Sequence, residues 1–268
     1  MLKLFFSSSV QIGIGINEVI VRHQKRTGKF YSSSTVTKSS INNSQPWDTQ
    51  LRTLLTENKI RNRTCYVHLS NDFVRHFIVK PAKNTVSLRD CRDVAYARFQ
   101  TLFGEKYEDW LIQGDWNQQY PFFACAIPKS LLHQLTQLTT EFKLRVLNTT
   151  PQLASVWNAH RKALSAGDLL IVIDKNLLQI ICIQQHGIGD IRMIPFFDTH
   201  EVQHNWLDQQ IRIESLRLGL SEIKKIHLVG NLPIAWKNSS VGIIDLTTKN
   251  TIPQTTSILH YVIGYERK

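Results

Sequence analysis

The 268-residue chain shows the same order of structural signals twice, and this repetition most limits the folds open to it. The first half begins with a strand hairpin and continues with helices and strands. A break at Ser165-Ala166-Gly167 follows, and the second half again begins with strands before a helix and further strands. The halves share no residue-level repeat. The pattern therefore predicts a duplicated α/β fold with mixed sheets, with one subdomain over residues 1–166 and a second over residues 167–268.

Hydrophobic periodicity and turn residues place the individual elements. Strands are expected at residues 10–24, 30–38, 110–116, 122–127, 143–148, 168–174, 177–184, 191–197, 226–229 and 241–246, with turns at 27–29 and 187–189. Residues 65–69 and 73–80 form either two strands or one bent strand. Helices are expected at residues 47–60, at 87–102 with Ser87 as cap and Gly104 as stop, from 129, from 151 with Pro151 in the first turn, at 199–218 and at 257–265.

The chain is basic, with 32 Lys and Arg against 21 Asp and Glu and a formal net charge of +11. Such a balance favours nucleic acid, an anionic membrane surface or an acidic protein segment as partner. The basic residues cluster on the first hairpin and after the first helix: Arg22, His23, Lys25, Arg26 and Lys29, then Lys59, Arg61 and Arg63. Few aromatic residues accompany them, and no known nucleic-acid-binding motif is present. We therefore expect a solvated basic face, with nucleic-acid binding as the lesser alternative.

Nothing in the sequence predicts a membrane span, because no run of 18 apolar residues occurs. The apolar segment before Ser7 is too short for the core of a signal peptide, which favours a cytoplasmic location. The four cysteines, Cys65, Cys91, Cys125 and Cys182, are far apart and form no C-x-x-C pair. We expect them to be buried free thiols.

The sequence His200-Glu201-Val202-Gln203-His204 matches the zinc motif H-E-x-x-H. Capping is the better explanation, because Glu201 falls at the third helical position if Asp198 is the N-cap. No suitable third ligand follows at the metzincin offsets, so no metal site is assigned and zinc hydrolysis is the lesser alternative. His68 and His76 have no recognisable catalytic partner in the sequence and are read as ordinary strand residues. No catalytic residue is assigned.

Gly13-Ile14-Gly15 follows the start of the first strand, but it does not make a dinucleotide fingerprint. Glu18 occupies the position of the third glycine, where a carboxylate would repel a pyrophosphate.

Four segments carry a family resemblance: Gly13-Ile14-Gly15-Ile16-Asn17, Ile171 to Asn176, His227-Leu228-Val229-Gly230-Asn231, and Tyr66 to Pro81 with its L-S-x-x-x-V-R stretch. Together with the order of elements, they resemble PilM-type pilus assembly proteins and the cytoplasmic domain of GspL-type secretion proteins. The resemblance implies an actin-like (ribonuclease H-like) fold. The first segment is similar to a phosphate loop of the pattern G-I-D-I-G, the second to the other phosphate loop, and the third to an adenosine-contacting L-V-G-G pattern.

The resemblance places a degenerate nucleotide cleft at Gly13, Gly15, Asp174 and Gly230. Gly15 stands where the family has an aspartate, and Asn17, Asn176 and Asn231 stand where it has glycines. Glycine permits the close approach of a backbone to phosphate, and a carboxylate helps to organise Mg²⁺. We therefore expect no cofactor and no catalysis, with Mg-ATP binding by an actin-like ATPase or kinase as the alternative.

The function that the resemblance implies is that of a non-catalytic cytoplasmic scaffold, peripheral to the bacterial inner membrane, in a type IV pilus or type II secretion apparatus. Its partner would be the cytoplasmic segment of an inner-membrane pilus or secretion assembly protein. An anionic membrane surface is a further candidate partner, because juxtamembrane basic residues are attracted to anionic lipid.

Overall fold

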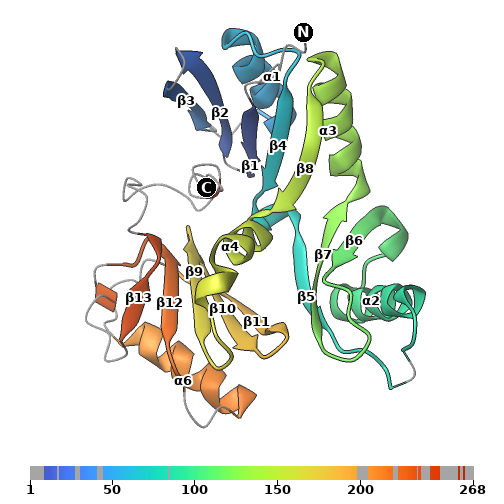
Figure 1. Cartoon of the computed structure of the whole chain (residues 1–268), viewed down its shortest axis with the longest axis vertical. Coiled ribbons are helices and arrows are strands. Elements are labelled where there is room, and N and C mark those ends of the chain that lie inside the picture. The colour runs from blue at the N-terminus through green and yellow to red at the C-terminus, as the bar shows by residue number, and fades with distance from the viewer. Residues whose placement is uncertain are drawn as a thin grey trace, which may run out of the picture.

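The computed structural model describes residues 9–16, 18–27, 31–40, 45–83, 85–197, 205–219, 223–233, 235–236, 242–247, 259 and 262. The first of its two five-stranded sheets has the strand order β3-β2-β1-β4-β8 (Figure 1). Strands β1, β2 and β3 pair antiparallel, whereas β1, β4 and β8 run parallel. The bounds are β1 (Val10–Ile14), β2 (Glu18–Thr27), β3 (Tyr31–Ser40), β4 (Thr64–Leu69) and β8 (Arg145–Pro151).

The second five-stranded sheet has the order β11-β10-β9-β12-β13. Its first three strands again pair antiparallel, and β9, β12 and β13 again run parallel. The bounds are β9 (Leu169–Asp174), β10 (Leu177–Gln184), β11 (Gly187–Pro195), β12 (Ile226–Gly230) and β13 (Ile243–Asp245). Both sheets thus have the same order and the same pattern of strand directions, which confirms the predicted duplicated α/β fold with mixed sheets.

A three-stranded sheet of order β5-β7-β6 lies between β4 and β8 in the sequence. With helix α2 it forms an inserted unit whose own core includes Phe77, Phe99 and Ile112. The capping box of Ser87 and Asp90 begins α2, and Gly104 ends it with a φ of 67°, as predicted. The sequence analysis located these elements but did not foresee a separate sheet. The bounds are β5 (Arg75–Val79), α2 (Leu88–Phe103), β6 (Trp110–Gly114) and β7 (Phe122–Pro128).

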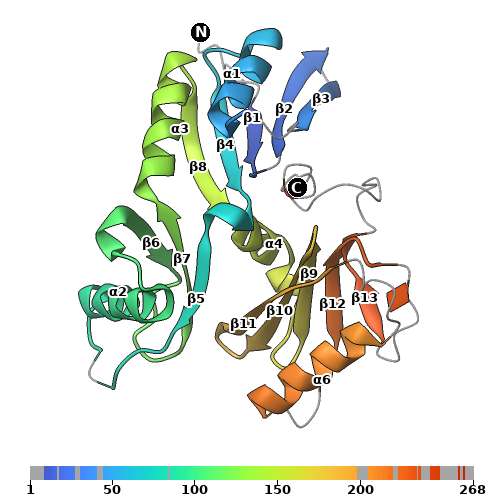
Figure 2. The same cartoon turned by 180° about the vertical axis from the view of Figure 1, so that it is seen from behind.

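Four further helices pack on the large sheets: α1 (Trp47–Glu57), α3 (Lys129–Glu141), α4 (Gln152–His160) and α6 (Trp206–Leu218). Helix α4 lies between the two large sheets (Figures 1 and 2). Its Leu153 and Val156 are fully buried and share one core with Leu170 and Val172 of β9. The alternate β9 residues face a second core beneath α6. Strand β9 is apolar from Leu169 to Ile173, as expected for a strand that is covered on both faces.

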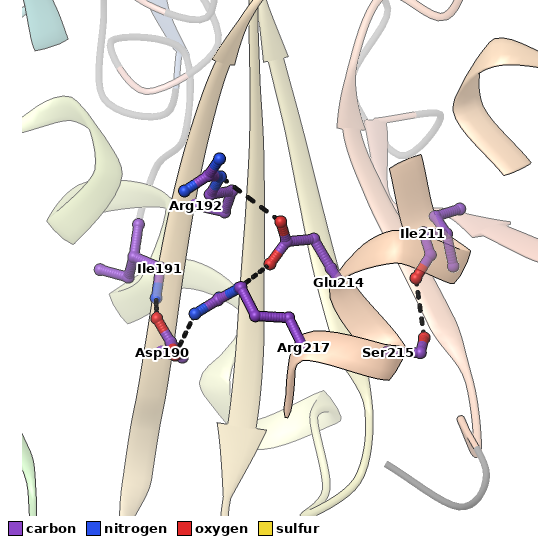
Figure 3. Close-up of polar contacts among 7 residues, drawn as sticks. All are labelled: Asp190, Ile191, Arg192, Ile211, Glu214, Ser215 and Arg217. Carbon is purple, nitrogen blue, oxygen red and sulfur yellow. Dashed lines mark hydrogen bonds and ion pairs between the residues drawn. The ribbon is translucent and has the colours of Figure 1, made fainter. Parts of the chain in front are cut away.

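An ion-pair network fastens α6 to β11, the edge strand of the second sheet (Figure 3). Glu214 of α6 has a side chain only 3% exposed, and it contacts Arg217 at 2.6 Å and Arg192 of β11 at 3.4 Å. Arg217 also donates to Asp190 of β11 over 3.1 Å. The buried carboxylate of Glu214 is thereby held between two cations.

Several predicted boundaries differ from the structure. Residues 10–24 do not form one strand, because the chain reverses after Ile14, where Gly15 N–H donates to the carbonyl of Glu18 over 2.8 Å. The predicted turn at 187–189 is also wrong: β11 begins at Gly187, so the turn lies at Gln185 and His186. Pro151 is the N-cap of α4 and not part of its first turn. The turn after Ile14 is concealed by the apolar residues on each side of it, and the turn at Gln185 and His186 was misplaced because Gly187 and Gly189 lie inside β11.

The remaining elements follow the predictions within a few residues, and residues 65–69 and 73–80 form two strands, β4 and β5, in different sheets. The predicted turn at 27–29 and the motif at 200–204 lie mostly or wholly outside the described residues, as does the start of the helix predicted at 199–218. Of the helix predicted at 257–265, Leu259 and Val262 are described, and both are helical.

Candidate functional site

The turn between β1 and β2 forms one side of the predicted nucleotide cleft. Gly13 lies in β1 beside Ile20, and Gly15 forms the turn itself. A Cβ atom added to Gly15 would meet its nearest neighbours, in Glu18 and Ser70, at 3.4 to 3.5 Å, which is ordinary van der Waals contact. The turn thus leaves room for a small side chain at Gly15, the position where the resembled family has an aspartate.

The turn between β9 and β10 forms the other side of the predicted nucleotide cleft. Asp174 ends β9, and Lys175 occupies the left-handed region with a φ of 53°. The Asp174 carboxylate accepts a hydrogen bond of 2.8 Å from the side-chain amide of Gln152, a fully buried residue at the start of α4. The acid in the second phosphate-loop-like segment is therefore engaged with another side chain of the protein.

An ion pair joins the two turns. The ammonium of Lys175 lies 3.4 Å from a carboxylate oxygen of Glu18, whose side chain is only 6% exposed. The two residues belong to different halves of the duplicated fold. Where the resemblance places the phosphates, the two turns thus meet through oppositely charged side chains, and one of these is a buried carboxylate that would repel a phosphate.

Gly230 lies at the end of β12 beside Ile173, with a φ of 118°. Its N–H donates to the hydroxyl of Thr247 over 3.0 Å, and that hydroxyl donates back to the Gly230 carbonyl over 3.3 Å. The structure thus places Asp174 and Gly230 at the carboxyl ends of the adjacent parallel strands β9 and β12, Gly13 in β1 of the first sheet, and Gly15 in the turn after β1. The backbone N–H of Gly230 is already used by Thr247.

The sequence analysis did not assign Gln152 or Lys175 to the site, and it used Glu18 only to reject a dinucleotide fingerprint. Glu18 offered a signal, since an acid directly after a glycine-rich turn opposes phosphate binding. Gln152 and Lys175 offered none, because their roles depend on the packing of α4 and the second sheet against the first.

His68 and His76 are neutral structural residues. His68 contacts the Ser155 hydroxyl at 3.1 Å, and His76 contacts the Asn71 side-chain oxygen at 2.9 Å. Burial lowers the pKa of His68 to about 4 and the pKa of His76 to about 3. Both imidazoles are therefore uncharged at neutral pH.

The four cysteines are buried and free, as predicted. Burial raises the pKa of the Cys65 thiol to about 11 and of the Cys125 thiol to about 12, so neither forms the reactive thiolate near neutral pH. Across the described ranges, no three His, Cys, Asp or Glu side chains gather as a metal site would require. Among the helices in those ranges, none is long and apolar enough to cross a bilayer.

Comparison with known proteins finds no match to a protein-family model or to a curated protein. Solved structures do match. The cytoplasmic domain of EpsL, an inner-membrane component of the type II secretion system of Vibrio cholerae, superposes with a TM-score of 0.59 at 8% identity, over 96% of this chain and 93% of that chain.

Two other structures match over similar lengths. A Bacteroides thetaiotaomicron protein with an actin-like ATPase fold and unknown function gives a TM-score of 0.62 at 12% identity, over 99% of this chain and 100% of that one. The PilM–PilN type IV pilus biogenesis complex gives 0.59 at 12% identity, over 89% of this chain and 88% of that one. The chain therefore has an actin-like fold similar to those of the EpsL cytoplasmic domain and the PilM–PilN complex, as its sequence resemblance predicted.

Proposed function

We propose that this protein is a non-catalytic scaffold of a type IV pilus or type II secretion assembly apparatus. It works on the cytoplasmic side of a bacterial inner membrane and docks on the cytoplasmic segment of an inner-membrane assembly protein. The single observation that carries the proposal is the Glu18–Lys175 ion pair, which joins the two turns where an actin-like ATPase would hold phosphates.

The charge of the cleft argues against Mg-ATP as a ligand. A triphosphate entering between the turns would have to separate Lys175 from Glu18 and would then lie beside a buried carboxylate. Asp174, the acid available to organise a metal and its water, is hydrogen bonded to Gln152. Binding of a triphosphate would therefore compete with the existing Lys175–Glu18 contact, and a metal at Asp174 would share that carboxylate with Gln152.

The structural neighbours support the assembly role. EpsL is an inner-membrane component of a secretion system, and PilM forms a complex with PilN in pilus biogenesis. We infer that this chain uses the same fold in the same way, as a docking platform whose binding energy comes from protein contacts and not from nucleotide.

Fluorescence anisotropy with labelled synthetic peptides tests the docking. The peptides would be the cytoplasmic segments of inner-membrane pilus and secretion assembly proteins from the same source organism, with scrambled sequences as controls. We expect one native peptide to bind saturably, the scrambled peptides not to bind, and millimolar Mg-ATP to leave the affinity unchanged. Absence of binding by every native peptide, or binding that requires Mg-ATP, would contradict the proposal.

A further inference from the structure

One end of the first large sheet carries a group of basic residues that the cleft does not explain. The connection from α1 to β4 contains Lys59, Arg61 and Arg63, the connection from α3 to β8 contains Lys143, and Arg145 is the first residue of β8. Lys59, Arg61, Lys143 and Arg145 are exposed, and Arg63 is half-buried. We call these five residues the basic end.

Backbone hydrogen bonds hold the two connections together. The N–H of Asn62 donates to the carbonyl of Phe142 over 3.2 Å, and the N–H of Arg145 donates to the carbonyl of Arg63 over 2.8 Å. Since β4 and β8 run parallel, both strands start at this end of the sheet, where α1 and α3 also end (Figure 1). The sequence predicted only the first three cations as a cluster, because Lys143 and Arg145 arrive through long-range pairing.

The basic end has few acidic neighbours. In the described part of the chain, none of its five residues forms an ion pair with an acid. The carboxylates at the ends of the two adjoining helices are Glu57 and Glu141, and Glu141 is paired with Arg52. The surface is therefore strongly positive.

The helix dipoles explain only some of the cations at the basic end. Lys59 and Lys143 follow the carboxyl ends of α1 and α3, where a cation interacts favourably with the helix dipole. Arg61, Arg63 and Arg145 lie beyond the last helical turns and in or before the strands, so the dipoles do not explain them.

The apolar residues between the cations all point inward. Ile60, Phe142 and Leu144 are at most 7% exposed, and the Arg61 guanidinium lies 5.3 Å from the buried Phe142 ring. No exposed apolar residue thus lies between the cations themselves, and the exposed apolar side chains further along the two strands are Tyr66 of β4 and Leu147 of β8, 39% and 46% exposed. Long cationic side chains whose intervening apolar residues are buried suit a surface of many negative charges that shift laterally, such as anionic lipid.

We propose that the basic end binds the anionic phospholipid headgroups of a membrane surface. The binding is electrostatic, requires no inserted segment, and weakens as ionic strength rises. This inference rests on the proposed function, because it identifies the surface with which a scaffold at the inner membrane would face the lipid. Vesicle binding needs no protein partner, so the two proposals fail separately.

Cosedimentation of the full chain with vesicles tests this inference. The vesicles would be phosphatidylcholine alone or phosphatidylcholine with about one third phosphatidylglycerol. We expect binding only to the anionic vesicles. In the triple variant Arg61→Gln, Lys143→Gln and Arg145→Gln, the partition coefficient should fall on the order of 100-fold, about fivefold for each cation removed.

A matched control removes the same charge elsewhere. Arg98, Lys162 and Arg212 are exposed on α2, after α4 and on α6. Changing all three to Gln should lower the partition coefficient by no more than about twofold to threefold, since most of their interaction with a bound surface is screened. The variant Arg61→Lys with Arg145→Lys keeps the charge and should bind like the wild type. Circular dichroism of each variant establishes that it is folded.

Equal loss of binding in the two triple variants would overturn the inference, and so would equal binding to neutral vesicles. Tighter binding to a short DNA duplex than to anionic vesicles, lost in the basic-end variant, would reassign this surface to nucleic acid. If vesicles do not bind while an assembly-protein peptide does, the lipid inference fails and the docking proposal stands.

Discussion

Glu18 and Lys175 form an ion pair between the two turns where the family resemblance places the phosphates. The Glu18 side chain is almost completely buried and that of Lys175 is 36% exposed, so their attraction is screened less than that of a surface pair. Removing the cation leaves a buried carboxylate without this partner, which costs more than losing an exposed ion pair.

A double-mutant cycle measures this interaction. Lys175→Met should lower the free energy of unfolding by about 1 kcal/mol, and the coupling energy with Glu18→Gln should also be about 1 kcal/mol. The exposed pair of Arg89 and Asp93, with atoms 4.0 Å apart and side chains 90% and 64% exposed, is the control, and we expect its coupling to be close to zero. Urea unfolding of the wild type, the two single variants and the double variant in each cycle gives the free energies of unfolding from which the coupling energy is calculated. A coupling energy between Glu18 and Lys175 that is as close to zero as that of the control pair would show that the turns are not joined energetically.

His68 and His76 make stability depend on pH. The unfolded chain protonates histidine near pH 6.5, whereas burial lowers the pKa of His68 to about 4 and that of His76 to about 3 in the folded state. The unfolded state therefore binds more protons, so stability is full above about pH 6.5 and is lost as the pH falls. Each histidine should contribute a slope of up to about 1.4 kcal/mol per pH unit between pH 6 and pH 5.

The variant His76→Phe isolates one of these contributions. It removes about half of the slope that the two histidines produce, although it also lowers stability at pH 7 because Asn71 loses its partner. Denaturant unfolding at a series of pH values gives the slopes. An unchanged slope in His76→Phe would contradict a neutral buried His76.

At the residue scale, the nucleotide cleft at Gly13, Gly15, Asp174 and Gly230 stays a prediction, and the sequence did not predict the contacts that these segments make. The glycines and Asp174 follow from local patterns that can be recognised along the chain. The contacts of this region are different. Glu18 pairs with Lys175, Asp174 accepts a hydrogen bond from Gln152, and in each pair the two residues come from different halves of the fold. No local pattern specifies such pairs, because they depend on how the two sheets pack around α4.

At the scale of single elements, α6 shows how a helix is fixed to a sheet by charge as well as by apolar packing. Trp206, Leu207 and Ile211 enter the second core, and Glu214 contacts Arg192 and Arg217 at the edge strand (Figure 3). If the charge of Glu214 is removed, the guanidinium groups of Arg192 and Arg217 lose their negatively charged partner. Each then loses a charge-assisted hydrogen bond or ion pair.

Glu214→Gln should therefore lower the free energy of unfolding by about 2 kcal/mol. The control is Glu105→Gln, whose pair with Arg75 has side chains 33% and 39% exposed, and its loss should be below about 1 kcal/mol. Denaturant unfolding compares the two variants. A loss for Glu214→Gln no larger than that of the control would show that the network in Figure 3 does not stabilise α6.

Element boundaries were predictable where a local signal defines them. The Ser87 cap and the Gly104 stop of α2 are examples, since both act within one helical turn. The turn at Gly15 was missed because apolar residues alternate on both sides of it and the segment therefore reads as one longer strand. Likewise, a glycine pair suggested a turn at 187–189, whereas Gly187 begins a strand.

At the scale of the whole molecule, the duplicated order of elements was the strongest prediction, and the two sheets confirm it. The third sheet was not foreseen, because β5 and β7 have the same local signals as the strands of the large sheets. What separates them is pairing, since Arg75 to Val79 align with Phe122 to Ala126 and not with β4. Such partners are far apart in sequence, so periodicity alone cannot assign them.

The central claim is that the protein binds no nucleotide between the β1–β2 and β9–β10 turns, which the ion pair of Glu18 and Lys175 joins. Isothermal titration calorimetry of the full chain with Mg-ATP tests this most directly, with Asp174→Ala measured in parallel. The account predicts no saturable heat at millimolar nucleotide for either protein. Saturable binding with a micromolar dissociation constant in the wild type, lost in Asp174→Ala, would contradict it and identify the protein as an ATP-binding member of the actin-like fold.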